Sequence, residues 1–225
     1  MAISLKSTSD LHTNGVKMLV YGHAGSGKTS LIPTLPSPVV LSAEGGLLSI
    51  QQANIPYIEI TTMAQLMEAY EWLTSSKEAD QFQSVALDSI SEIAEVVLAE
   101  ELKRNKDGRA AYGELNTVMA SMIRSFRDLP NRNVYFTAKC EKAQDETGRM
   151  LYAPSMPGKS LSQGLGYFFD LVMPLRVDKD SEGNIVRALM TDTDGLWQAK
   201  NRSAGRLSMW EAPDLGEIIK KIGGV

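Results

Sequence analysis

Eight residues near the N-terminus constrain this chain more than any other feature: Gly22-His23-Ala24-Gly25-Ser26-Gly27-Lys28-Thr29. They match G-x-x-x-x-G-K-[ST] at every fixed position, and Ser30 follows. The glycines let backbone N–H groups turn inward around phosphate oxygens. Lys28 adds a positive charge, and the Thr29 hydroxyl can ligate Mg²⁺. The pattern therefore predicts a phosphate loop over residues 22–30 that binds ATP with Mg²⁺.

The residues on either side of the loop have the pattern that such a loop requires. Residues 16–21 are mainly apolar and predict a buried strand, and residues 28–35 predict a short helix that stops near Pro33 and Pro36. Strand, loop and helix must follow one another in this order. The N-terminus of the helix would then direct its positive dipole end at the same anion.

The rest of the chain alternates between predicted strands and helices. Further strands are expected at 38–42, 57–60, 84–88 and 133–138; helices are expected from Thr61 or Thr62 onward and at 89–103 and 112–129. This alternation predicts an α/β fold, in which helices cover both faces of a mainly parallel, twisted sheet.

The last third of the chain has a different character. Residues 144–157 are polar with Gly and Pro, which predicts a long mobile loop, and a helix is expected over 159–169. Residues 171–177 and 185–190 predict a β-hairpin, and a last helix is expected over 215–222. We expect one domain over residues 16–225, preceded by a polar lead-in at 1–15.

Composition narrows the functional classes. A chain of 225 residues with 43% hydrophobic content suits one α/β domain, and no apolar run approaches the ~20 residues of a membrane span. The N-terminus lacks the features of a signal peptide, and the single cysteine, Cys140, excludes a disulfide framework within the chain. We therefore expect a cytoplasmic protein. The net charge of −4 does not itself indicate nucleic-acid binding, and it does not exclude it, because such binding depends on local clusters of positive charge.

Polar residues at the ends of predicted strands complete a candidate ATPase site. Asp88 ends a buried strand and is placed to help hold Mg²⁺, although it could also cap the helix that follows. Glu44 lies just past the second strand, before two glycines, and could orient the attacking water; an ordinary turn glutamate is the alternative. At the tip of the fifth strand, Thr137 and Lys139 are both candidates for a sensor of the γ-phosphate.

Three segments together resemble RecA-type ATPases. Residues 39–46 resemble the RecA strand that ends in the catalytic glutamate, which is Glu44 here, and residues 85–89 resemble the RecA Walker B strand. Residues 196–205 resemble the late strand of RecA and DnaB-like ATPases, with Lys200 and Arg202 at the positions of the paired cations. The resemblance covers about residues 16–210 and is closest to the compact RecA cores of phages, including single-strand annealing proteins of the Sak type.

This resemblance implies a homo-oligomer, either a ring or a filament. Lys200 and Arg202 would reach the γ-phosphate bound by a neighbouring subunit. It also implies that the segments at about 104–114 and 140–163 face single-stranded DNA, with a single-strand binding protein as a possible partner. If the protein is phage-encoded, its location is the host cytoplasm. Tyr112 and Tyr152 could stack on bases. Ordinary solvated lysines and arginines in loops are the alternative interpretation of the seven cations in or beside these segments: Lys103, Arg104, Lys106, Arg109, Lys142, Arg149 and Lys159.

Two other functions remain open at this point. The chain could be a small-molecule P-loop kinase, with residues 140–160 as its lid. It could also be a nucleotide-gated loader or binding module that holds ATP but turns it over negligibly. The main hypothesis is an ATPase that couples turnover to single-stranded DNA binding or annealing. The three hypotheses differ in what stimulates ATP consumption.

Overall fold

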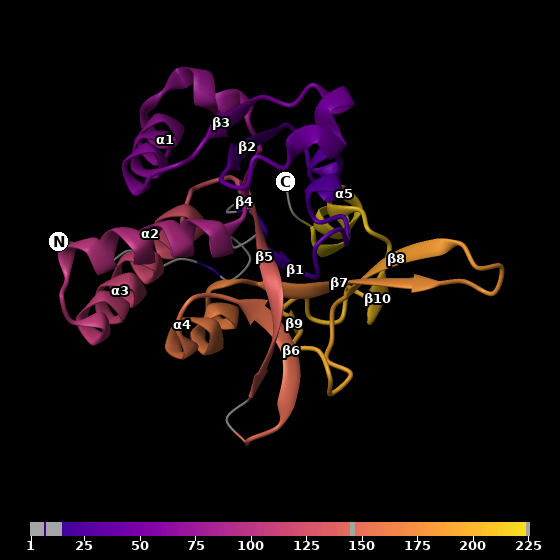
Figure 1. Ribbon diagram of the computed structural model, residues 1–225. Coiled ribbons are helices and arrows are strands. Elements are labelled where there is room, and N and C mark those ends of the chain that lie inside the picture. Colours follow the sequence, from indigo (N-terminus) through magenta and orange to yellow (C-terminus); the bar gives the residue numbers. More distant parts are fainter. Residues whose placement is uncertain (1–6, 8–14, 145–146, 224–225) are drawn as a thin grey trace.

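A computed structural model describes residues 7, 15–144 and 147–223, and Figure 1 shows its arrangement. The predicted lead-in at 1–15 lies almost wholly outside the described residues. A parallel sheet runs through the centre in the order β7-β1-β5-β4-β2-β3. These strands are β1 (Lys17–Tyr21), β2 (Pro38–Ser42), β3 (Tyr57–Glu59), β4 (Ser84–Asp88), β5 (Asn133–Gln144) and β7 (Leu171–Lys179).

Both faces of this sheet are covered, because successive strand residues point to opposite sides. Leu19, Val85 and Phe136 belong to the core that packs against helices α1 (Met63–Ser75), α2 (Ile90–Arg104), α3 (Gly108–Arg127) and α4 (Lys159–Gly164). Met18 and Tyr135 belong to the opposite core, beneath the 3₁₀ helices η2 (Thr29–Thr34) and η3 (Leu47–Ala53) and helix α5 (Leu215–Ile222). The predicted α/β class is confirmed.

The strand order brings three chain segments to one edge of the sheet. Strand β5 lies between β1, which leads into the phosphate loop, and β4, which ends at Asp88. In the register, Tyr21 is paired with Ala138 and Leu87 with Phe136. Parallel strands end at the same edge, so the residues that follow β1, β4 and the middle of β5 meet there. We call this the carboxyl edge.

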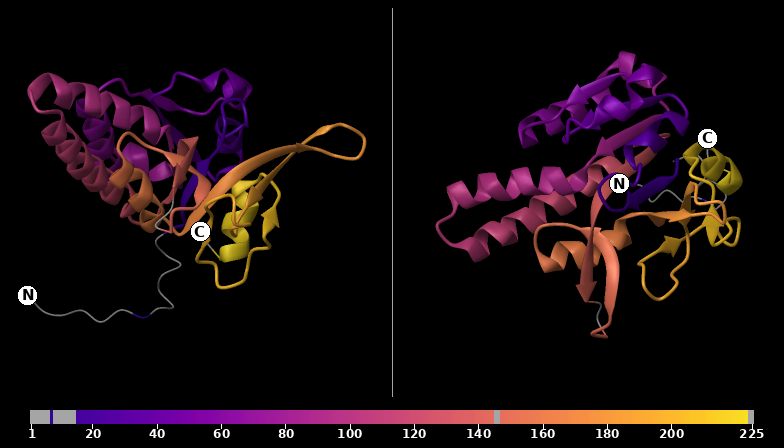
Figure 2. Two further views of the ribbon diagram at one scale, coloured as in Figure 1. Left: turned by 60° about the horizontal axis from the view of Figure 1, so that its bottom comes forward. Right: turned by 45° about the vertical axis from the view of Figure 1, so that its right-hand side comes forward.

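Antiparallel strands extend the sheet at two places. Strand β6 (Met150–Ser155) pairs with the outer half of β5, so the prediction of a loop over 144–157 is wrong. The polar residues at 144–149 and Pro154 favour a loop, although the apolar segment between them, residues 150–153, forms a strand by pairing with β5. Strand β8 (Ile185–Met190) pairs with β7, which confirms the predicted hairpin. Its outer part, residues 177–187, projects from the body as an arm (Figure 2).

Several predicted boundaries change. Residues 29–34 form a 3₁₀ helix with Pro33 inside it, and the segment predicted as one helix over 159–169 divides into α4 and η5 (Leu165–Phe168). The predicted strand over 196–205 is reduced to β9 (Lys200–Asn201), and β10 (Trp210–Glu211) follows. The sequence predicts either Thr61 or Thr62 as the N-cap of α1. In the structure Thr62 is the cap, and it forms a capping box with Gln65.

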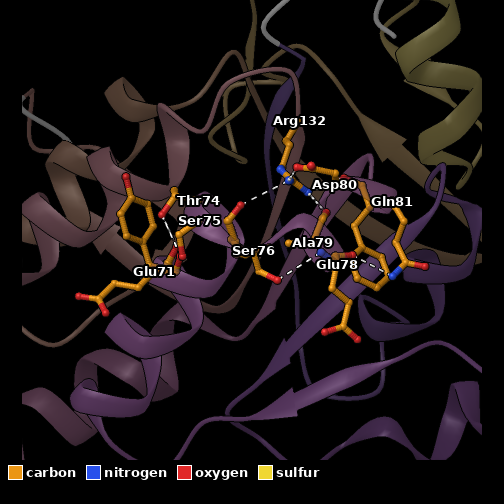
Figure 3. Close-up of polar contacts among 12 residues, drawn as sticks. Glu71, Thr74, Ser75, Ser76, Glu78, Ala79, Asp80, Gln81 and Arg132 are labelled. Atoms are coloured by element: carbon orange, nitrogen blue, oxygen red, sulfur yellow. Dashed lines mark hydrogen bonds and ion pairs between the residues drawn. The ribbon is translucent and has the colours of Figure 1, made fainter.

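The opposite, amino edge of the sheet is closed by buried cations. Arg132 is 8% exposed and donates to the carbonyls of Ala79 (2.7 Å) and Phe82 (2.6 Å) in the connection that includes η4 (Lys77–Gln81) (Figure 3). The Lys17 ammonium donates to the carbonyls of Leu129 and Arg132, at 3.2 and 2.5 Å. Charged groups buried in this way are held by full hydrogen bonding, which indicates a structural role.

Candidate nucleotide site

The phosphate loop follows β1 at the carboxyl edge and depends on its glycines. Gly27 has φ +103°, a conformation that residues with side chains rarely adopt. Gly22 is needed for close approach, since a β-carbon there would lie 2.8 Å from the Ser26 hydroxyl oxygen. That hydroxyl is buried and has no hydrogen-bond partner among the described residues. An unpaired polar atom inside the loop fits a loop that is completed by a polar ligand.

Lys28 places its charge over this loop. Its ammonium donates to the carbonyls of Gly22 (3.0 Å) and His23 (3.2 Å). Burial lowers the pKa of Lys28, and the nearby carboxylates of Glu44 and Asp88 oppose that shift. The backbone carbonyl of Lys28 accepts from the Tyr135 hydroxyl at 2.8 Å, which ties the loop to β5. Because η2 has only six residues, the groups here that could bind phosphate are the loop amides and Lys28 rather than a helix dipole.

Two oxygen groups that would hold Mg²⁺ lie together as the sequence predicts. The Thr29 hydroxyl donates to one carboxylate oxygen of Asp88 at 2.7 Å, and the Thr137 hydroxyl donates to the other. In the part of the chain that the structure describes, no group of three or more His, Cys, Asp or Glu side chains could hold a metal. The Thr29 hydroxyl and the Asp88 carboxylate fit Mg²⁺ because this ion usually takes one or two protein oxygens and keeps water and phosphate as its other ligands.

Glu44 lies beside this pair. Its backbone N–H is 3.3 Å from the carbonyl of Asp88, and its carboxylate accepts a hydrogen bond from the Ser89 hydroxyl. The side chain is exposed, as a group that contacts water must be. The two sensor candidates differ. Thr137 contacts Asp88, whereas Lys139 pairs with Glu92 and Glu95 of α2 at 2.9 Å each, and these bonds raise its pKa.

Comparison with known protein families agrees with this geometry. Residues 14–203 match the family described as AAA domain. The chain belongs to this AAA-domain family. It is therefore a P-loop ATPase that binds nucleotide, as the motif at 22–29 predicts. A search of curated proteins finds no match, and no helix among the described residues is long and apolar enough to cross a membrane.

Sequence reasoning missed four contacts that shape the site of this AAA-domain ATPase. The Tyr135 hydroxyl and the Arg187 guanidinium both bind phosphate-loop carbonyls. The His23 ring meets Tyr152 and Trp197 edge-on, at centroid distances of 5.8 and 5.9 Å. These residues come from β5, β6, β8 and the segment before β9. They share no spacing in the sequence, so no motif could have found them.

The predicted trans-acting cations of the AAA-domain chain lie away from its own phosphate loop. Strand β9 pairs with the first residues of β7, near the amino edge. The Lys200 ammonium donates to the carbonyl of Gly166 at 2.8 Å, and Arg202 lies 3.8 Å from Asp170. Arg202 has 55% of its side chain exposed. Since Arg202 lies outside the short strand β9, strand alternation does not align it with Lys200, and their action on a neighbour stays a prediction.

Proposed function

We propose that this ATPase couples ATP turnover to single-stranded DNA binding as a RecA-like oligomer that acts in recombination or replication, including annealing of the phage Sak type. One observation carries the coupling. Strand β5 runs without a break from Thr137, which contacts Asp88, to Lys142 in the β5–β6 hairpin. Five residues of strand span roughly 17 Å. A single rigid element thus joins the nucleotide site to the surface proposed for DNA.

A second contact connects the same two places. Tyr152 of β6 stacks on Trp197 with ring centroids 4.3 Å apart, and the His23 ring of the phosphate loop meets both edge-on. A change in the conformation of the phosphate loop on nucleotide binding would therefore alter the packing of the β5–β6 hairpin through these ring contacts. The Lys142 ammonium lies over the Tyr152 ring at 5.2 Å. The Tyr152 ring is already stacked on Trp197 and contacted by the Lys142 ammonium. We therefore assign DNA contact to the cations and not to base stacking on Tyr152.

We propose the following roles for the site residues. Lys28 and the loop amides hold phosphates, Thr29 and Asp88 hold Mg²⁺, and Glu44 polarises the attacking water. Lys200 and Arg202 stabilise charge on the nucleotide of the adjacent subunit. A cation supplied in this way is worth on the order of 10³-fold or more in rate in related systems. Turnover per subunit should consequently fall on dilution.

The ATPase rate, measured with and without single-stranded DNA, tests the proposal. We expect Lys142→Glu to abolish stimulation by DNA and leave the basal rate unchanged; Lys77→Glu, with the same change of charge at an exposed site on η4, keeps both. We expect Arg202→Ala to lose turnover at all concentrations. If DNA stimulates the ATPase rate of neither the wild type nor the Lys77 variant, the proposal that turnover is coupled to DNA is wrong. The assignment as an ATPase would still stand.

The two other functions make different predictions. In a nucleotide-gated module with negligible turnover, Glu44→Gln changes little, whereas in an ATPase it stops hydrolysis and traps the bound nucleotide. The kinase hypothesis requires a mobile lid at 140–160. Most of that segment is paired strand in β5 and β6, which supports the ATPase proposal over a mobile lid.

A further inference from the structure

Arg187 reaches the phosphate loop from a distant part of the chain. Its Nε donates to the backbone carbonyl of Ser26 at 2.9 Å, across 161 residues of sequence. A β-carbon on Gly27 would lie 3.2 Å from this Nε and 3.5 Å from the Arg187 Cδ. The guanidinium therefore lies directly against the Ser26–Gly27 peptide, which is two residues from Lys28 at its Ser26 end.

The position of Arg187 comes from the sheet. In the β7–β8 hairpin Arg187 is paired with Val177, and β7 itself pairs with β1, which leads into the loop. The hydrogen bond from Arg187 to Ser26 is thus donated from strand β8, which β7 connects to the main sheet. The arm residues 177–187 project from the body in Figure 2, so this contact joins the arm to the nucleotide site.

The bond fixes the direction of a peptide. In a trans peptide the C=O and the following N–H point in opposite directions, and the only cis peptide among the described residues joins Asp88 and Ser89. Holding the Ser26 carbonyl on the Arg187 side therefore turns the Gly27 N–H away from Arg187. Gly27 has φ +103° and no side chain, so its peptide has little local restraint of its own.

We propose that Arg187 is a positioning residue of the ATP site, which holds the Ser26–Gly27 peptide so that the Gly27 N–H faces the phosphates. This inference needs ATP binding at the phosphate loop and does not depend on DNA coupling. Backbone amides of such loops contact the α- and β-phosphates. Arg187 should therefore affect ATP and ADP alike, unlike a cation that acts on the γ-phosphate alone.

The test measures the affinity of the full-length protein for ATP and ADP by calorimetry, without DNA, together with KM, kcat and the melting temperature. Arg187→Met keeps the packed stem and removes the donor. We expect the Kd of both nucleotides and the KM to rise about tenfold, as for loss of one charged hydrogen bond, with kcat and the melting temperature close to wild type. Val186→Ala, on the neighbouring residue of β8, is the matched control and should change none of these.

Arg187→Lys provides a second variant in case the methionine variant does not fold, and it should show a smaller rise in Kd for both nucleotides. Guanidinium added to Arg187→Ala should restore part of the affinity. Unchanged Kd values in the folded variants would overturn the proposal. A loss confined to kcat, with ADP affinity intact, would also overturn it, because it would make Arg187 a catalytic residue at the γ-phosphate.

Discussion

The two edges of the parallel sheet both gather polar side chains, but they use them differently. At the carboxyl edge Thr29, Glu44 and Lys28 are half-buried or exposed around a loop that holds an unpaired hydroxyl. At the amino edge Lys17 and Arg132 are buried, and their donors end on backbone carbonyls of the same chain. The first set is only partly buried and surrounds an unpaired hydroxyl, whereas the second set is buried and uses its donors inside the fold.

The comparison shows that burial of a charge does not by itself mark a functional site. A buried cation must be hydrogen-bonded or it costs several kcal/mol, and loop carbonyls meet that need as well as a ligand does. What distinguishes the carboxyl edge is that its polar groups come from β1, β2, β4 and β5 and converge on one point. Variants at the two edges should therefore separate turnover from stability.

The largest effect is expected at the carboxyl edge, for Asp88→Asn. The amide removes the negative charge that would hold Mg²⁺ with Thr29, so we expect kcat to fall about 10³-fold, the order seen when a group that stabilises transition-state charge is removed. Asp80→Asn is the matched control. Asp80 is an exposed acid 3.8 Å from Arg132 at the amino edge, and its loss should leave turnover unchanged. Equal losses in the two variants would contradict the assignment of edges.

Arg132→Met should produce the opposite result. The variant keeps an apolar stem but leaves the carbonyls of Ala79 and Phe82 without their donor, and the carbonyl of Leu73 (3.3 Å) as well. We expect the free energy of unfolding to fall by about 3 kcal/mol, measured by urea denaturation. Turnover per folded molecule should match wild type. Arg127→Met, on α3, loses only an ion pair with Asp128 near the surface and should cost under about 1 kcal/mol.

Lys17 gives the amino edge a pH dependence. Burial lowers the pKa of Lys17 from 10.5 to about 8, although the negative charge of Asp170 opposes the shift. The unfolded chain therefore binds more protons than the folded one between about pH 8 and 10.5. The destabilisation from burying this charge is complete below pH 8 and is relieved as the pH rises through that window.

The free energy of unfolding should thus rise across that window, by at most about 1.4 kcal/mol per pH unit from this group. The measurement compares urea denaturation of wild type and Lys17→Met from pH 7 to 10. The difference between the two curves should shift in favour of wild type as the pH rises. Parallel curves would show that Lys17 does not titrate in this range.

Local patterns predicted most of the elements and the first residues of the site. The phosphate loop, Asp88 at a strand end and Glu44 before two glycines each depend on short segments, and the structure brings all three together. The position of β5 between β1 and β4 was not predicted, since strand order depends on how whole helices pack. That order is what puts Thr137, and not Lys139, on Asp88.

The contacts that sequence reasoning missed have partners far along the chain. Strand β6 depends on pairing with β5, and a short segment that contains Pro154 and follows a polar run gives no sign of that pairing. Arg132 and Arg187 look like ordinary surface arginines in the sequence. Their roles come from carbonyls that the fold brings to them from 53 and 161 residues away. Such residues can be found from topology but not from spacing.

Tyr21 gives the smallest expected effect and sharpens the comparison, because it is a fully buried polar residue at the carboxyl edge. Its hydroxyl lies 2.9 Å from the carbonyl of Tyr152 and 2.7 Å from that of Gln198, and burial raises its pKa. If open bonding capacity and not position marks function, Tyr21→Phe should behave like an amino-edge variant. We expect a loss of about 1 kcal/mol in stability and an unchanged basal ATPase rate.

The exposed Tyr57, changed to Phe, is the control for Tyr21 and should change neither quantity. A fall in basal turnover for Tyr21→Phe, with the control unchanged, would mean that position at the carboxyl edge matters even for a residue that is fully buried and hydrogen-bonded. The phosphate loop would then depend on the bond between the end of β1 and the β6 strand. In that case the nucleotide site would extend into the hairpin, because Tyr21 directly precedes Gly22 and its hydroxyl contacts the backbone of Tyr152.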